Sequence, residues 1–86
     1  MSRRPYIMAG DWIDIGPAAC VISAVREEGH QSGDCEVVFN ALRPTRQDVE
    51  WDGNEWRFAT RANSTGAADQ YPRLAPYVAQ LRAGRP

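Results

Sequence analysis

The sequence predicts a mainly β protein: a small antiparallel barrel of about five strands, followed by a short C-terminal helix. Three observations lead to this prediction. Short apolar runs recur between residues 12 and 58, and each is bounded by turn-forming residues. Several of them alternate apolar and polar residues, which is the period of a half-buried strand. Apolar residues at helical spacing occur near the end of the chain, within residues 71–86.

The first two strands are predicted on either side of a Gly-Pro turn. In residues 10–16, Ile13 and Ile15 alternate with less apolar neighbours, so we expect a half-buried strand. Residues 18–25 are apolar on both sides, which is typical of a central strand covered on both faces.

The third strand is predicted at residues 35–40, where alternate positions are apolar and share one face. A polar link with two glycines, residues 26–34, precedes it. Residues 41–46 are predicted as a loop, because Pro44 cannot donate a hydrogen bond to a strand ladder.

Residues 49–58 are predicted to form a hairpin whose register follows from a two-residue loop at Gly53 and Asn54. This register separates apolar from charged side chains: Trp51 faces Trp56, Val49 faces Phe58, and Glu50 faces Arg57. Moving the loop one residue earlier would set Glu50 against Glu55, which is repulsive. The aromatic residues of the hairpin are therefore predicted to be core.

One domain accounts for all 86 residues. The barrel strands are predicted within residues 10–58, a flexible connector at residues 59–70, and a helical segment at residues 71–86. The helix is predicted to start near Pro76 and to stop at Gly84. Its apolar stripe consists of Leu74, Val78 and Leu81.

The stretch "GDWIDI", followed by a turn and "CVISAV", resembles the opening of SH3-like barrels, including the KOW and Tudor types. In those barrels a Gly-Asp pair leads a strand of alternating apolar residues. The resemblance covers residues 10–58 and implies the fold. A KOW motif would show a glycine near the start of the second strand, where this chain has Ala18, Ala19 and Cys20. The resemblance therefore transfers no functional residue.

Charge is distributed unevenly along a chain whose net charge is −1. Residues 11–55 contain ten acidic residues against three arginines, whereas residues 56–86 contain five arginines against one aspartate. Residues 1–10 add two arginines. An acidic middle with basic ends has to be explained by any functional proposal.

A metal site is not predicted. Cys20, His30 and Cys35 have the spacing C-x9-H-x4-C, which lacks the closely paired ligands of tetrahedral zinc sites. A simple hairpin of the second and third strands would place Cys20 near Phe39 and Val25 near Cys35. The two sulfur atoms would then lie too far apart for a disulfide, so we expect buried, reduced thiols and no cofactor.

An enzyme is not predicted either. His30 lies in a polar turn close to Ser32 and Asp34, and neighbouring loop residues rarely form a triad held in a shaped pocket. The sequence also lacks a P-loop, a nucleophile elbow and a dinucleotide fingerprint. No apolar stretch has the length of a signal peptide or a membrane span, so we expect a cytoplasmic protein.

The favoured function is a protein- or peptide-binding adaptor with an acidic face. If the barrel strands bury their apolar side chains, the outward positions include Trp12, Asp14, Glu36, Asp48 and Glu50. An exposed tryptophan among carboxylates would hold the cationic side chain of a basic peptide. One alternative stays open at this point: the C-terminal helix packs on Trp12 and covers its ring.

The second candidate function is RNA association through the arginine-rich ends. Its contacts would be Arg3, Arg4, Arg73, Arg82 and Arg85. The acidic barrel would repel phosphate, which disfavours this function. Alternatively, these arginines lie over the acidic barrel of their own chain.

Overall fold

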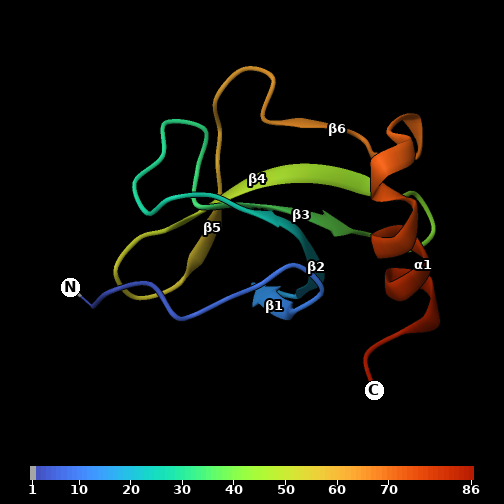
Figure 1. Cartoon of the computed structure of the whole chain (residues 1–86), viewed down its shortest axis with the longest axis horizontal. Helices are drawn as coiled ribbons and strands as arrows, with labels where there is room; N and C mark the ends of the chain where they lie inside the picture. The colour runs from blue at the N-terminus through green and yellow to red at the C-terminus, as the bar shows by residue number, and fades with distance from the viewer. Residues whose placement is uncertain (1) are drawn as a thin grey trace.

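The structure, a computed structural model, describes residues 2–86 and is mainly β (Figure 1). Its strands are β1 (Trp12–Ile15), β2 (Ala18–Val25), β3 (Cys35–Phe39), β4 (Thr45–Trp51), β5 (Trp56–Phe58) and β6 (Thr65–Ala67). Two short 3-10 turns, η1 (Ala68–Gln70) and η2 (Pro72–Leu74), lead into helix α1 (Ala75–Ala83).

The strands form one antiparallel sheet in the order β1-β2-β3-β4-β5, and β6 pairs with β4 beside β5. The sheet curls into a half-barrel, so that β1 approaches β5. Helix α1 lies across one end of the sheet, against β2 and β3. The predicted fold class is confirmed, with one additional strand.

The predicted hairpin register is confirmed. In β4 and β5, Val49 pairs with Phe58, Glu50 with Arg57, and Trp51 with Trp56. The two tryptophan rings meet edge to face, with their centroids 5.2 Å apart. The pleat puts both rings on the face of Val49, where Trp56 is buried in the inner core and Trp51 is partly buried against it.

Each face of the sheet has its own core. The inner face of the half-barrel buries Ile13, Ile15, Cys20, Ile22, Cys35, Val37, Val49 and Trp56, with Phe39, Trp51 and Phe58 packed against them. On the opposite face, Val21 and Val38 pack under the apolar stripe of the helical segment: Leu74, Val78 and Leu81. The residues of β2 contribute to both cores, so this strand is covered on both faces. This is what its apolar sequence predicts.

Two segments differ from the prediction. Residues 41–46 are not all loop, because Thr45 and Arg46 already belong to β4, pairing with β3 and β6. Residues 59–70, expected to be a flexible connector, include β6 and the η1 turn. The segment runs beside β4, where Thr65 pairs with Gln47 and Gly66 with Arg46, and the backbone N–H of Ala68 donates a hydrogen bond to the carbonyl of Pro44.

Candidate functional site

Trp12 and Asp14 lie on β1, on the face that carries the helix. Their neighbours Ile13 and Ile15 point into the half-barrel, so the strand pleat turns Trp12 and Asp14 outward. Trp12 is only half-buried, because it packs against the edge of the helical core without being enclosed by it. The helix therefore covers part of the Trp12 ring and leaves another part accessible.

The chain's own Arg85 occupies the accessible side of Trp12. Its guanidinium carbon lies 5.2 Å from the centre of the Trp12 ring, which is cation–π geometry. Its two terminal nitrogens reach both oxygens of Asp14, with Nη2–Oδ1 at 3.0 Å and Nη1–Oδ2 at 3.3 Å. Trp12 and Asp14 thus hold a guanidinium by stacking and by a two-point ion pair.

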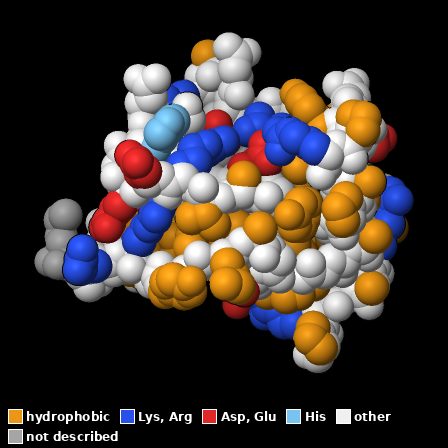
Figure 2. Space-filling view, in the orientation of Figure 1, with side chains coloured by type: hydrophobic (Ala, Val, Ile, Leu, Met, Phe, Trp, Pro, Cys, Tyr) orange, Lys and Arg blue, Asp and Glu red, His pale blue; other side chains and the backbone are white. Residues whose placement is uncertain are grey.

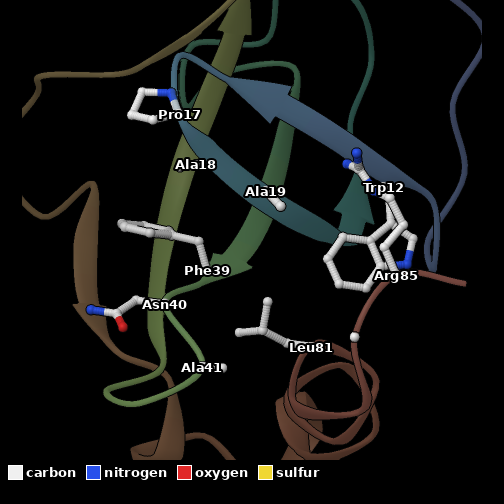
Figure 3. Close-up of a pocket in the computed structure, with 10 residues that line it drawn as sticks. Trp12, Pro17, Ala18, Ala19, Phe39, Asn40, Ala41, Leu81 and Arg85 are labelled. Carbon is white, nitrogen blue, oxygen red and sulfur yellow. The ribbon is translucent and has the colours of Figure 1, made fainter.

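An apolar groove of about 580 Å³ opens beside this arginine (Figure 3). Trp12 and Arg85 lie on one side of it and Phe39 on the other, with Leu81 of α1 below them. Ala19 and the other small residues at the start of β2 leave the groove open. Its lining is mostly apolar, and the charged groups lie at one end.

Glu36 and Asp48, two of the predicted binding carboxylates, are in a different place. They face each other across β3 and β4, whereas β2 separates them from β1. They form an ion cluster, which we define as Arg26, Glu36, Arg46, Asp48 and Arg73. Figure 2 shows arginine and acidic side chains gathered together on the side of the molecule that carries β4 and β6.

Glu36 is fully engaged inside this cluster. Only 1% of the residue is exposed, and its carboxylate accepts hydrogen bonds from Arg73 at 2.8 and 2.9 Å, from Arg46 at 2.7 Å and from Ser23 at 2.7 Å. Burial alone would raise the pKa of Glu36, but the hydrogen bonds from Arg73, Ser23 and Arg46 outweigh it and lower the pKa from 4.5 to about 2. Glu36 is therefore ionised and already neutralised by its own chain.

Asp48 and Glu50 are also paired within the chain. Asp48 is 7% exposed and binds Arg46 at 2.7 Å and Arg26 at 3.0 Å. Glu50, more exposed, meets Arg61 at 3.4 Å. The five predicted residues therefore do not form one continuous acidic face. Trp12 and Asp14 are brought together, whereas Glu36 and Asp48 are buried under arginines.

Four of the five arginines predicted to contact RNA are engaged within the chain. Arg4 pairs with Asp34 at 3.2 Å, Arg73 binds Glu36, and Arg85 binds Asp14. Arg82 donates to the backbone carbonyl of Ala41 at 3.3 Å. The fifth, Arg3, is exposed. The two arginine-bearing ends of the chain also lie at opposite sides of the molecule (Figure 1).

The cysteines lie on the inner face and are free thiols. The predicted pairing of β2 with β3 is confirmed, with Cys20 opposite Phe39 and Val25 opposite Cys35. Burial, reinforced by Asp14 near Cys20 and by Asp34 near Cys35, raises the pKa of each thiol to about 12. Neither thiol is therefore a nucleophile near neutral pH.

His30 is exposed, and its Nδ1 accepts a hydrogen bond from the backbone N–H of Ser32 at 3.0 Å. Within residues 2–86, no three His, Cys, Asp or Glu side chains lie close enough together to hold a metal ion. The same part of the chain contains no helix long and apolar enough to cross a membrane.

Sequence reasoning missed the groove and the role of Arg85 at Trp12. Phe39 and Leu81 come from β3 and α1, and the sequence contains no signal that places them on either side of Trp12. The arginine pattern did carry a weaker signal, because basic ends around an acidic middle indicate pairing within the chain. It could not say which arginine meets which carboxylate.

Comparison with known proteins returns no relative: no family model, no curated protein and no solved structure matches this chain. A function for it therefore has to be inferred from the geometry of its own residues.

Proposed function

We propose that this chain is a non-enzymatic protein-interaction module, built on an SH3-like barrel, that binds an arginine-bearing segment of a partner protein at Trp12 and Asp14. One observation carries the proposal: the chain's own Arg85 is held there by both residues at once. A site that accepts this guanidinium has the shape and charge to accept another.

The two contacts complement each other chemically. The indole ring attracts a cation through its π face, which contributes roughly 0.5–1 kcal/mol at an exposed site. The Asp14 carboxylate adds a bidentate ion pair that a planar guanidinium matches better than an ammonium group does. Since β1 is held in the sheet, Trp12 and Asp14 are positioned before a ligand arrives.

Of the residues predicted to form an acidic binding face, the proposal uses only Trp12 and Asp14. Glu36 and Asp48 are buried and neutralised by arginines of the chain itself, so an incoming basic peptide would have to displace those arginines. Asp14, by contrast, has a side chain that is 63% exposed even with Arg85 bound to it.

Peptide titration tests the proposal. The probe is a capped five-residue peptide with arginine between alanines, compared with the same peptide carrying lysine or citrulline. Binding is followed by the indole N–H signal of Trp12 in NMR spectra, and in a protein without Trp12 by the backbone amide signals of β1. We expect the arginine peptide to bind best and the citrulline peptide, which has no charge, to bind worst.

Variants of the protein assign the binding to the site. Asp14→Asn and Trp12→Ala are both made in Arg85→Ala, where the chain's own guanidinium does not compete for the site. In this protein Asp14→Asn should weaken binding of the arginine peptide by roughly two- to fivefold, and Trp12→Ala by a similar factor. Tyr6→Ala and Glu55→Gln are the matched controls, because each removes an exposed ring or carboxylate away from the groove. Equal binding of the arginine and citrulline peptides, or full binding by Asp14→Asn, would refute the proposal. Asp14→Asn keeps the test decisive if Trp12→Ala does not fold.

RNA association stays a second prediction, and the contacts of the arginines do not favour it. Retention on heparin separates the two functions. We expect elution at low salt that replacing Arg82 and Arg85 by alanine leaves unchanged. Salt-sensitive retention that these replacements weaken would favour a nucleic-acid partner.

A further inference from the structure

The groove extends beyond the space that Arg85 uses. Between Trp12 and Phe39 it presents an apolar surface of small residues from β2 and of Leu81. Residues 84–86 place no apolar side chain in it, because the residue before Arg85 is a glycine and Pro86 does not line the groove. A Cβ added at Gly84 would meet no atom within 4 Å. The chain's own segment thus uses the charged end of the site and leaves the apolar end open.

Residues 84–86 are also weakly held. The backbone N–H of Gly84 ends the helix by donating to Gln80 at 3.2 Å, and the remaining contacts are those of the Arg85 side chain. That ion pair is exposed to solvent, with 43% of the Arg85 side chain and 63% of the Asp14 side chain accessible. Exposed pairs of this kind contribute little to stability, so displacing the Arg85 side chain from Asp14 costs little free energy.

The helix itself does not depend on this contact. Val78 and Leu81 are buried against the sheet, and the Gln80 side chain donates to the carbonyl of Gly10 at 2.7 Å. Residues 84–86 can therefore leave Trp12 while α1 stays in place. Their departure would leave an empty guanidinium site at Trp12 and Asp14, which continues into the apolar groove.

We infer that the partner segment carries a bulky apolar residue next to its arginine, and that it replaces the chain's own residues 84–86. Its arginine takes the position of Arg85 against Trp12 and Asp14, and its apolar side chain enters the groove toward Phe39 and Leu81. Arg85 acts as a built-in competitor for this site. The inference rests on the proposed function, and it adds an apolar residue to the arginine that the partner segment carries.

The experiment crosses two peptides with three proteins. One capped five-residue peptide has its arginine flanked by leucines, and the other has glycines in the same positions. Each is titrated into the wild-type chain and into Arg85→Ala, with unfolding curves confirming that both proteins fold. The third protein, Ala19→Phe, adds a ring to the wall of the groove between Trp12 and Phe39, and its unfolding curve is recorded in the same way.

We expect the leucine peptide to bind the wild type on the order of tenfold more tightly than the glycine peptide, because a leucine side chain leaves water. Arg85→Ala should strengthen binding of both peptides by roughly three- to tenfold, since the competitor is gone. In Ala19→Phe the ratio between the two peptides should fall toward one.

Three different results would each contradict a different part of the proposal. If both peptides bind with the same affinity, the apolar half of the ligand is wrong while the arginine site stands. If Arg85→Ala leaves affinity unchanged or lowers it, Arg85 is no competitor and the replacement of residues 84–86 is wrong. If neither peptide binds the wild type or Arg85→Ala, the proposed function itself fails.

Discussion

Replacing Glu36 by glutamine tests whether the ion cluster stabilises the fold. Glu36 is buried, yet its carboxylate accepts hydrogen bonds from two arginines and a serine. Glutamine keeps the shape of the side chain and removes the charge. Arg46 keeps Asp48 as a partner at 2.7 Å, whereas Arg73 loses its bidentate carboxylate.

The magnitude follows from the pKa of Glu36, which the folded state lowers from 4.5 to about 2. A shift of this size corresponds to about 3 kcal/mol of stabilisation by the charged form at neutral pH. Because the folded pKa is the lower one, this stabilisation is present above pH 4.5 and is lost as the pH falls toward 2. At pH 3 about 1 kcal/mol of it should remain.

The assay is urea unfolding of wild type and Glu36→Gln between pH 7 and pH 3. We expect the variant to be less stable by about 3 kcal/mol at pH 7, and the difference to shrink to about 1 kcal/mol at pH 3. Glu55→Gln, at an exposed position, should change the free energy of unfolding by less than about 0.5 kcal/mol. A deficit below about 1 kcal/mol at pH 7, or one that does not depend on pH, would refute this account of the cluster.

Three further predictions concern the core and the backbone. Trp56→Ala should lower the free energy of unfolding by about 3–5 kcal/mol in urea, because it empties the inner core, whereas Tyr6→Ala, 88% exposed, should be nearly neutral. A mild effect of Trp56→Ala would contradict its assignment to the core. A thiol reagent at neutral pH should label Cys20 and Cys35 only after unfolding, and rapid labelling of the folded protein would contradict their burial. Gly33→Ala should cost about 1–3 kcal/mol, since φ is +105° and the new Cβ would lie 2.9 Å from a backbone carbonyl oxygen; unchanged stability would refute this.

The sequence was most informative where local rules act alone. The register of the β4–β5 hairpin followed from charge pairing and the Gly53 loop, and the structure has the same cross-strand register. The ion pairs themselves differ, because Glu50 meets Arg61 and Arg57 meets Asp52. The helix limits followed from Pro76 and Gly84, and α1 ends at Ala83. The pairing of β2 with β3, and with it the separation of the two cysteines, followed from a single assumed turn.

The sequence was least informative about β6. Thr65–Ala67 has too few apolar residues to indicate a strand. Its pairing depends on residues 45–47, about twenty positions earlier, which offer an unpaired edge beside β5. A strand of this kind forms because a neighbour supplies hydrogen bonds, and periodicity along the chain does not record that.

The alternation of apolar and polar residues was enough to predict which strand side chains face inward and which face outward, because this alternation is a local property of the backbone. On this basis, the side chains predicted to point away from the barrel interior included those of Trp12, Asp14, Glu36 and Asp48. The residues that each of these four side chains contacts there depend on tertiary packing. Arg46 and Arg73 close over Glu36, while Arg85 rests on Trp12 and leaves a groove beside it. Which charge meets which depends on how β4, η2 and the end of α1 pack against the sheet, and those are contacts between residues far apart in the chain.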